Sequence, residues 1–195
     1  RNRKICEGRF YNPHLSWSFN SNLIAFEARE GNESDVWIFD LQTARLTKLV
    51  RGDAPVWSPI ANQLAFRRWE EGVDVVYRIN SDTTGLTPIV RIPIEGRVRS
   101  FSFLDPPSWS LDGQRIAIGL DHQHYKSGYA RIRLQHINGT RLSEIPTQHQ
   151  HVKQIGWSVD GTQLAYVLRG SVRPDSLLDK RLHITEVNVG NKTRT

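Results

Sequence analysis

One ten-residue motif occurs four times in this 195-residue chain, and it constrains the fold more than any other feature. Each copy opens with Trp-Ser and has an alanine eight residues after the tryptophan, preceded by Ile or Leu and followed by Phe, Ile or Tyr. The copies are WSFNSNLIAF (17–26), WSPIANQLAF (57–66), WSLDGQRIAI (109–118) and WSVDGTQLAY (157–166). Four tryptophans in one context, at spacings of 40, 52 and 48 residues, indicate an internal structural repeat.

Each copy of the motif predicts two strands joined by a turn. The third and fourth copies carry Asp112–Gly113 and Asp160–Gly161 before the apolar run. Asp-Gly is a strong hairpin signal, because glycine adopts the positive φ that the turn requires. The first two copies have Asn20–Ser21 and Ile60–Ala61 there, so we expect looser turns in them. Alternation places the alanine on the opposite face of the second strand from its bulky neighbours, where another sheet can approach closely.

Two further strands follow each motif. The third strands are predicted to end at Asp40, Asn80, Asn138 and Asn188. The fourth strands begin near Arg45, Gly85 and Thr140, and the last copy ends before completing one. Four antiparallel strands in each repeat of about 40–50 residues are typical of a blade of a β-propeller. The predicted fold class is therefore all-β, with four four-stranded blades that form a propeller or a consecutive run of blades from one.

The predicted blades cover approximately 9–50, 51–90, 97–145 and 151–195 of a single domain, 1–195. Residues 1–8 are predicted to form a fourth strand, since RKICEG at the start of the chain matches TKLVRG at the end of the first blade. This strand either closes a four-bladed ring, with Arg3 to Cys6 beside 181–187, or belongs to a preceding blade of a larger propeller. We favour the second interpretation, in which exposed end blades lead to self-association.

The motif WS-x-D-G-x-x-[IL]-A-[FY] resembles the repeat of TolB-like propellers and of the propellers that precede some serine peptidase domains. The resemblance covers nearly the whole chain and implies about six blades in the complete protein. It also implies a non-catalytic scaffold that binds a protein or peptide of the bacterial cell envelope, in the periplasm or another extracytoplasmic compartment. The alternative that it implies is a propeller gating a serine peptidase of the prolyl-oligopeptidase type, whose catalytic domain lies outside this chain.

Catalytic motifs are absent from the sequence. It contains no G-x-S-x-G nucleophile elbow, no glycine-rich phosphate loop and no H-E-x-x-H, so we expect no enzyme activity and no cofactor in this chain. The net charge of +6 comes from scattered residues, which does not favour a nucleic-acid partner. No apolar run approaches the ~18 residues of a membrane span. A single cysteine, Cys6, excludes an internal disulfide and a cysteine metal site.

Two His-x-His pairs are the residues that most suggest a metal ion. They are His122 with His124 and His149 with His151. Such spacing on a strand would put both rings on one side. Both pairs fall in connecting segments, however, and Asp121 is the only adjacent carboxylate. We interpret them as solvated loop histidines and predict no metal site.

The two ends of the blades differ in their connections. Turns after first and third strands share one end, which we call the short-turn face, and loops after second and fourth strands share the long-loop face. Loop length varies only on the long-loop face, and Trp, Tyr and Arg are favoured in interfaces. We therefore predict a partner-binding surface there and around the central opening. Its residues are Arg67, Arg68, Trp69, Arg97, Arg99, His122, His124, Tyr125 and His151. The alternative is that these loops have drifted without selection.

The motif tryptophans lead to a prediction about burial. Trp17, Trp57, Trp109 and Trp157 should be equivalent and largely buried between blades, because they share one context. Trp69 lies outside the motif and should be more exposed than any of them.

Overall fold

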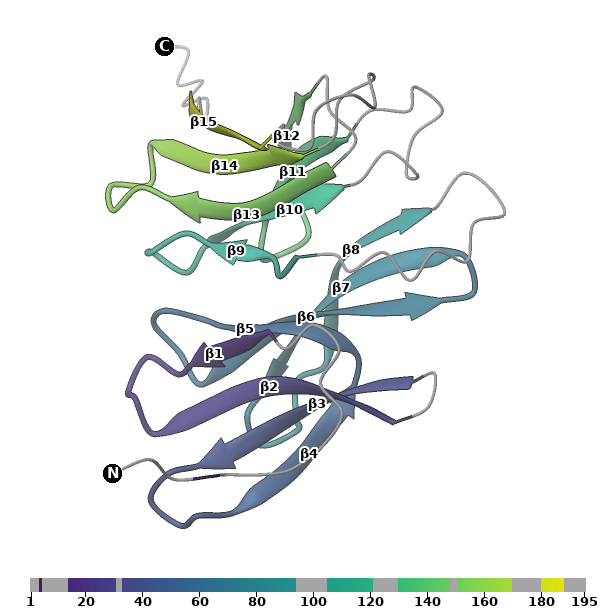
Figure 1. The fold of residues 1–195 in the computed structure, drawn as a ribbon, viewed down its shortest axis with the longest axis vertical. Helices are drawn as coiled ribbons and strands as arrows, with labels where there is room; N and C mark the ends of the chain where they lie inside the picture. The colour runs from purple at the N-terminus through teal and green to yellow at the C-terminus, as the bar shows by residue number, and fades with distance from the viewer. Residues whose placement is uncertain are drawn as a thin grey trace.

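The computed structural model describes residues 4, 14–30, 33–93, 105–120, 130–147, 151–169 and 180–187. Its regular structure consists of β-strands in four sheets (Figure 1). The first sheet contains β1 (Leu15–Trp17), β2 (Leu23–Glu30), β3 (Glu33–Asp40) and β4 (Leu46–Arg51). The second contains β5 (Asp53–Trp57), β6 (Gln63–Glu70), β7 (Val73–Asn80) and β8 (Thr87–Pro93). The third contains β9 (Ser108–Trp109), β10 (Arg115–Leu120), β11 (Arg131–His136) and β12 (Arg141–Pro146). The fourth contains β13 (His151–Trp157), β14 (Gln163–Arg169) and β15 (Lys180–Glu186).

Every sheet is an antiparallel meander, in which each strand pairs with the next one along the chain. The register repeats as well, since the tryptophan of each motif pairs with the residue seven positions later. The four pairs are Trp17–Ile24, Trp57–Leu64, Trp109–Ile116 and Trp157–Leu164. This shared register confirms that the four motif copies form equivalent hairpins and that the fold is all-β.

The predicted third strands are present in all four sheets. β3 and β7 end at Asp40 and Asn80 as expected, whereas β11 ends at His136, two residues before Asn138. The end predicted at Asn188 lies outside the described residues.

The motif serine organises the first turn of the first, third and fourth sheets. In the third sheet the Ser110 hydroxyl accepts a hydrogen bond from the Arg115 backbone N–H at 3.0 Å and donates one to the Asp112 carboxylate at 2.5 Å. Gly113 then adopts a φ of 66° and donates its N–H to the Ser110 carbonyl at 2.9 Å. The recurring serine is therefore structural.

The first sheet forms the same tight turn without glycine, so the expectation of a looser turn there is wrong. Ser21 adopts a φ of 57° and donates its N–H to the Ser18 carbonyl at 2.9 Å. Asn20 takes the place of the aspartate, because its side-chain oxygen accepts from the Ser18 hydroxyl at 2.7 Å. The second sheet differs, and there the Gln63 N–H donates to the Ala61 carbonyl at 2.8 Å.

Three apolar clusters join successive sheets, and each contains a motif alanine. Ala25 packs in the cluster between the first and second sheets, Ala65 in the next cluster and Ala117 in the third, and all three are fully buried. The equivalent Ala165 is only half-buried, because the described residues include no sheet beyond the fourth. The alanine therefore has the predicted role at every interface between sheets.

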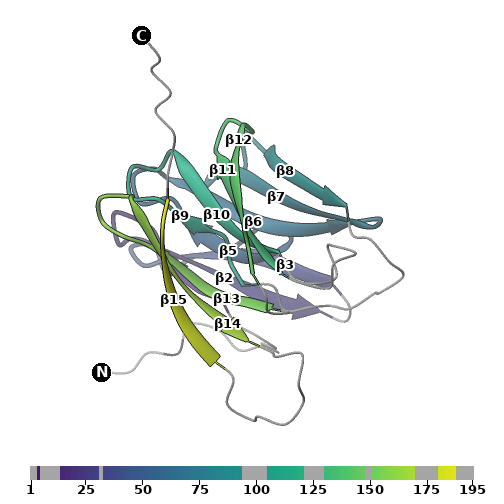
Figure 2. The same cartoon turned by 90° about the horizontal axis from the view of Figure 1, so that it is seen from above.

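The four sheets form an open arc. Figure 1 places the first sheet and the fourth sheet at opposite ends of the molecule, and Figure 2 shows the fourth sheet from above, in front of the first. Leu182 and Ile184 on β15 pair with Val167 and Ala165, on the face turned away from the third sheet, and both are exposed. The described sheets therefore do not close a four-bladed ring. The prediction that Arg3 to Cys6 pairs beside β15 falls on residues of which only Lys4 is described.

Candidate functional site

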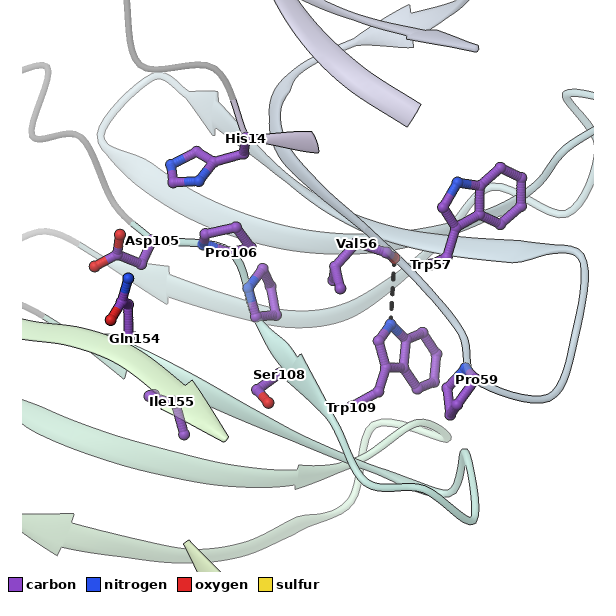
Figure 3. A pocket seen from close by; sticks show the side chains of 11 residues that line it. His14, Val56, Trp57, Pro59, Asp105, Pro106, Ser108, Trp109, Gln154 and Ile155 are labelled. Carbon is purple, nitrogen blue, oxygen red and sulfur yellow. Dashed lines mark hydrogen bonds between the residues drawn. The ribbon is translucent and has the colours of Figure 1, made fainter. Parts of the chain in front are cut away.

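A pocket of about 450 Å³ lies where the first strands of the four sheets converge (Figure 3). β5, β9 and β13 form its walls together with the residue that precedes β1. The lining residues are His14, Val56, Trp57, Pro59, Asp105, Pro106, Pro107, Ser108, Trp109, Gln154 and Ile155. Because every sheet contributes, the pocket marks the axis of the arc. A concave site with apolar walls and a few polar groups is typical of ligand binding in proteins.

Two motif tryptophans connect neighbouring sheets beside this pocket. The Trp109 indole N–H donates to the Val56 carbonyl at 3.3 Å, and the Trp157 indole N–H donates to the Ser108 carbonyl at 3.0 Å. In both cases the acceptor directly precedes the tryptophan of the previous sheet. The inner strands are therefore joined by a contact that repeats with the motif.

The burial prediction for the tryptophans is partly wrong. Trp57 and Trp109 are buried, at 4% and 8% exposed, and Trp157 is half-buried. Trp17, however, is 51% exposed, as much as Trp69 at 50%. The described residues place no sheet before the first one, so Trp17 has no preceding inner strand to pack against.

β-bulges shape two of the pocket's walls. Ala54 in β5 and Gln154 in β13 stand three residues before their motif tryptophans and adopt φ values of 50° and 47°. The strand register shifts at both places. Residues other than glycine with positive φ cost about 1–3 kcal/mol, and bulges often redirect side chains at functional sites. Gln154 lines the pocket as a result.

The polar end of the pocket is close to neutral in charge. Burial lowers the pKa of His14 below its usual value, although the carboxylates of Asp105 and Glu27 oppose the change. His14 is therefore mainly uncharged at pH 7. Lys153 Nζ lies 3.6 Å from Asp105 Oδ2, which balances the one carboxylate of the pocket.

A second carboxyl near the pocket titrates close to neutral pH. Burial raises the pKa of Asp53 to about 7, and the carboxylates of Glu27 and Asp74 add to the increase. The guanidinium groups of Arg67 and Arg29 oppose it. Carboxyls with strongly perturbed pKa values are enriched at functional sites, although structural ion pairs also produce them.

Arg67 is part of the structural core, not of an exposed surface. It is 1% exposed, forms an ion pair with Asp74 in its own sheet, and donates to the Gly119 carbonyl of the third sheet at 3.1 Å. It also donates to the Asp105 carbonyl at 3.4 Å. Arg67 therefore joins the second and third sheets beside the pocket, and it offers no surface to a partner.

The placement of residues 67–69 in a loop is wrong, because β6 continues to Glu70 and only Glu71 and Gly72 form the turn. Arg68 lies on this strand with its guanidinium 4.3 Å from the centre of the Tyr77 ring.

Comparison with known proteins supports the fold. Neither a protein-family model nor a curated protein matches the sequence. Among solved structures, TolB from Acinetobacter baumannii has a TM-score of 0.64 and 18% identity, over 90% of this chain and 41% of TolB. An acylaminoacyl peptidase has a TM-score of 0.64 and 13% identity, over 89% of this chain and 32% of the peptidase. The β-propeller domain of the Trilobed protease from Pyrococcus furiosus has a TM-score of 0.61 and 14% identity, over 88% of this chain and 54% of that domain.

The chain has a β-propeller fold. It spans between about a third and half of the length of these neighbours, and at such low identities the likeness establishes the fold alone. The four sheets are blades, and the pocket lies on the propeller axis. TolB and the propeller domain of the Trilobed protease share this fold, in agreement with the resemblance of the motif to TolB-like repeats.

Apart from the buried Arg67, the described members of the predicted binding surface lie near the long-loop face of the propeller. Trp69 precedes the turn from β6 to β7 and is exposed, Arg68 is half-buried beside it, and His151 begins β13. The other predicted members lie outside the described residues; they are Arg97, Arg99, His122, His124 and Tyr125.

A metal site finds no support in the described part of the chain, where no group of three or more His, Cys, Asp or Glu side chains could hold an ion. The described residues also form no helix long and apolar enough to cross a membrane.

Sequence reasoning missed the residues that line the axial pocket. His14 and Gln154 occupy the third position before a motif tryptophan, and Asp105 and Lys153 occupy the fourth. Alignment of the segments before the motif, in addition to the motif itself, would have found polar side chains at equivalent positions of the inner strands.

Proposed function

We propose that this propeller is a non-catalytic scaffold that binds a protein or peptide on its long-loop face and at its axial pocket. The axial pocket is the observation that carries the proposal. Side chains from all four blades reach it, including His14, Trp57, Asp105 and Gln154. Its apolar wall can hold partner side chains, and its polar groups can select them by hydrogen bonding.

The surroundings of the pocket support a macromolecular partner. Two of the pocket's polar residues, His14 and Asp105, precede first strands at the long-loop face, where Trp69 and His151 also lie. Exposed tryptophan is enriched among residues that dominate protein interfaces. The fold shared with TolB supports a cell-envelope partner and an extracytoplasmic location.

Mutation of the long-loop face tests the proposal. We expect Trp69→Ala with His151→Ala to lose partners captured from the native extract, because both changes remove contact surface and leave the core intact. The matched control is Arg45→Ala with Thr47→Ala, where both side chains are exposed at the short-turn end of β4. Loss of partners by the control, with retention by the Trp69 and His151 variant, would place the binding surface elsewhere.

A propeller that gates a serine peptidase is the second candidate function. The TM-score of 0.64 with an acylaminoacyl peptidase equals that with TolB, so the fold favours neither candidate. The complete reading frame distinguishes them. A following domain with a G-x-S-x-G nucleophile elbow would support the gating function, and its absence would support the scaffold.

A further inference from the structure

The tips of the innermost hairpins carry apolar side chains in all four blades. The residue two positions after each motif tryptophan is apolar, and Ile60 adds a fifth apolar side chain in the second blade. We call these residues the tip ring: Phe19, Pro59, Ile60, Leu111 and Val159. All except Pro59 are between 47% and 85% exposed. Turn tips are normally polar, and side chains that face solvent do not stabilise the turn, so folding alone does not explain this repetition.

Contacts join the tips of the second, third and fourth blades. Ile60 lies over the turn of the third blade. If Gly113 carried a Cβ, that atom would lie 2.5 Å from the Ile60 Cδ1. Arg115 lies over the next turn in the same way and donates to the Gly161 carbonyl at 3.1 Å. Pro59 also lines the axial pocket. The tip ring therefore follows the arc beside the end of the axis at the short-turn face, opposite the long-loop face.

Carboxylates share the short-turn face with the tip ring. Hydrogen bonds within the turns lower the pKa values of Asp40, Asp82 and Asp160, the last to about 2. At Asp112 burial raises the pKa, but hydrogen bonds within the turn outweigh burial, so this pKa is lowered as well. All four side chains are therefore ionised at neutral pH.

Cations are fewer among the described turns of this face. Arg115 pairs with Asp112 at 3.2 Å and Arg141 pairs with Glu144 at 3.1 Å, and Arg45 is the third cation. The described turns of the short-turn face therefore carry four aspartates against three arginines, although the whole chain has a net charge of +6.

We propose that the tip ring is a second docking surface, which binds a basic amphipathic peptide segment of a partner. Apolar side chains of the segment cover the tip ring, and its Lys or Arg residues face the carboxylates of the short-turn face. Charge complementarity of this kind selects the partner and speeds association. A second copy of this chain fits less well, because two such faces would bring carboxylates against carboxylates.

Binding of short labelled peptides to the chain tests this surface. The probe is a fluorescein-labelled peptide of alternating leucine and lysine, and the matched probe alternates leucine and glutamate. We expect the lysine peptide to bind at least about tenfold more tightly by fluorescence anisotropy. This order is the reverse of what the net charge of the chain would produce. Phe19→Ser with Leu111→Ser should weaken the lysine peptide at least about tenfold. Leu15→Ser removes an exposed leucine at the opposite end of β1 from Phe19 and should leave the binding unchanged.

Three results would overturn the proposal. The first is equal or tighter binding of the glutamate peptide. The second is unchanged binding of the lysine peptide by the Phe19 and Leu111 variant, with circular dichroism showing a retained fold. The third is self-association of the unmodified chain that this variant abolishes, which would make the tip ring an interface between copies. Partner capture through Trp69 and His151 is measured independently, so failure of either surface is distinguishable.

Discussion

At the scale of single residues, the blades contain side chains that repeat and side chains that occur once. The indole contacts of Trp109 and Trp157 repeat, because each bonds to the carbonyl before the previous motif tryptophan. Arg67 occurs once, since the equivalent position is Gly119 in the next blade. Residues of the second kind give this propeller its own axial chemistry.

Removing the Arg67 side chain should destabilise the protein strongly. Arg67→Ala leaves the Asp74 carboxylate buried without its cation, which costs about 3–5 kcal/mol in the free energy of unfolding. Arg51→Ala is the matched control, because it breaks an exposed pair with Glu33 and should cost at most about 1 kcal/mol. Urea unfolding measures both. Equal losses in the two variants would contradict the structural role of Arg67.

Asp53 should make stability fall as the pH rises. Its folded pKa of about 7 lies above the ordinary value of 3.8, so between these values the folded chain keeps a proton that the unfolded chain releases. The destabilisation therefore grows from about pH 4 and is complete above pH 7. Asp53→Asn cannot ionise, so we expect its gain in melting temperature to be larger at pH 8 than at pH 5. A gain that is the same at both pH values would show that Asp53 is not titrating.

At the scale of elements, the second strand of each blade determines how closely the next blade can pack. Ala65 and Ala117 are fully buried in clusters that join their blade to the following one. Ala165 occupies the same position in the fourth blade and is only half-buried. One motif position therefore has two environments, according to whether a blade follows.

Enlarging the motif alanine should separate these environments. Ala65→Leu forces extra atoms into a filled interface and should destabilise the protein by about 1–3 kcal/mol. Ala165→Leu has space on the open face and should cost clearly less. Thermal or urea unfolding of the two variants gives the comparison. A larger loss for Ala165→Leu would mean that the fourth blade is covered in solution.

At the scale of the whole molecule, the open arc leaves an apolar face at the end of the fourth blade. Leu182 and Ile184 are exposed there, on the side that other blades use for packing. We expect the chain to self-associate with increasing concentration, because contact between such faces removes apolar surface from water.

Sedimentation velocity tests this expectation. Leu182→Ser with Ile184→Ser should shift the chain towards the monomer, whereas Leu86→Ser changes an exposed leucine in a turn and should have no effect. A monomer at every concentration of the unmodified chain would show that the end faces do not associate.

Local pattern alone determined the strands, their order and the register of the hairpins. The Trp-Ser-to-Ala motif specifies these features through strand alternation and turn chemistry, which act over about ten residues and are visible in one sequence. Only the tertiary structure decided which side chains reach the axis. The sequence predicts Arg67 at the surface, but the structure buries it between two blades. Its guanidinium can donate to the carbonyl of Gly119, the neighbouring residue in the next blade. The tertiary structure also brings His14, Asp105 and Gln154 together in one pocket. Their proximity depends on the curvature of four packed sheets, and no pattern within a single repeat encodes a contact between repeats that are about 50 or more residues apart in the chain.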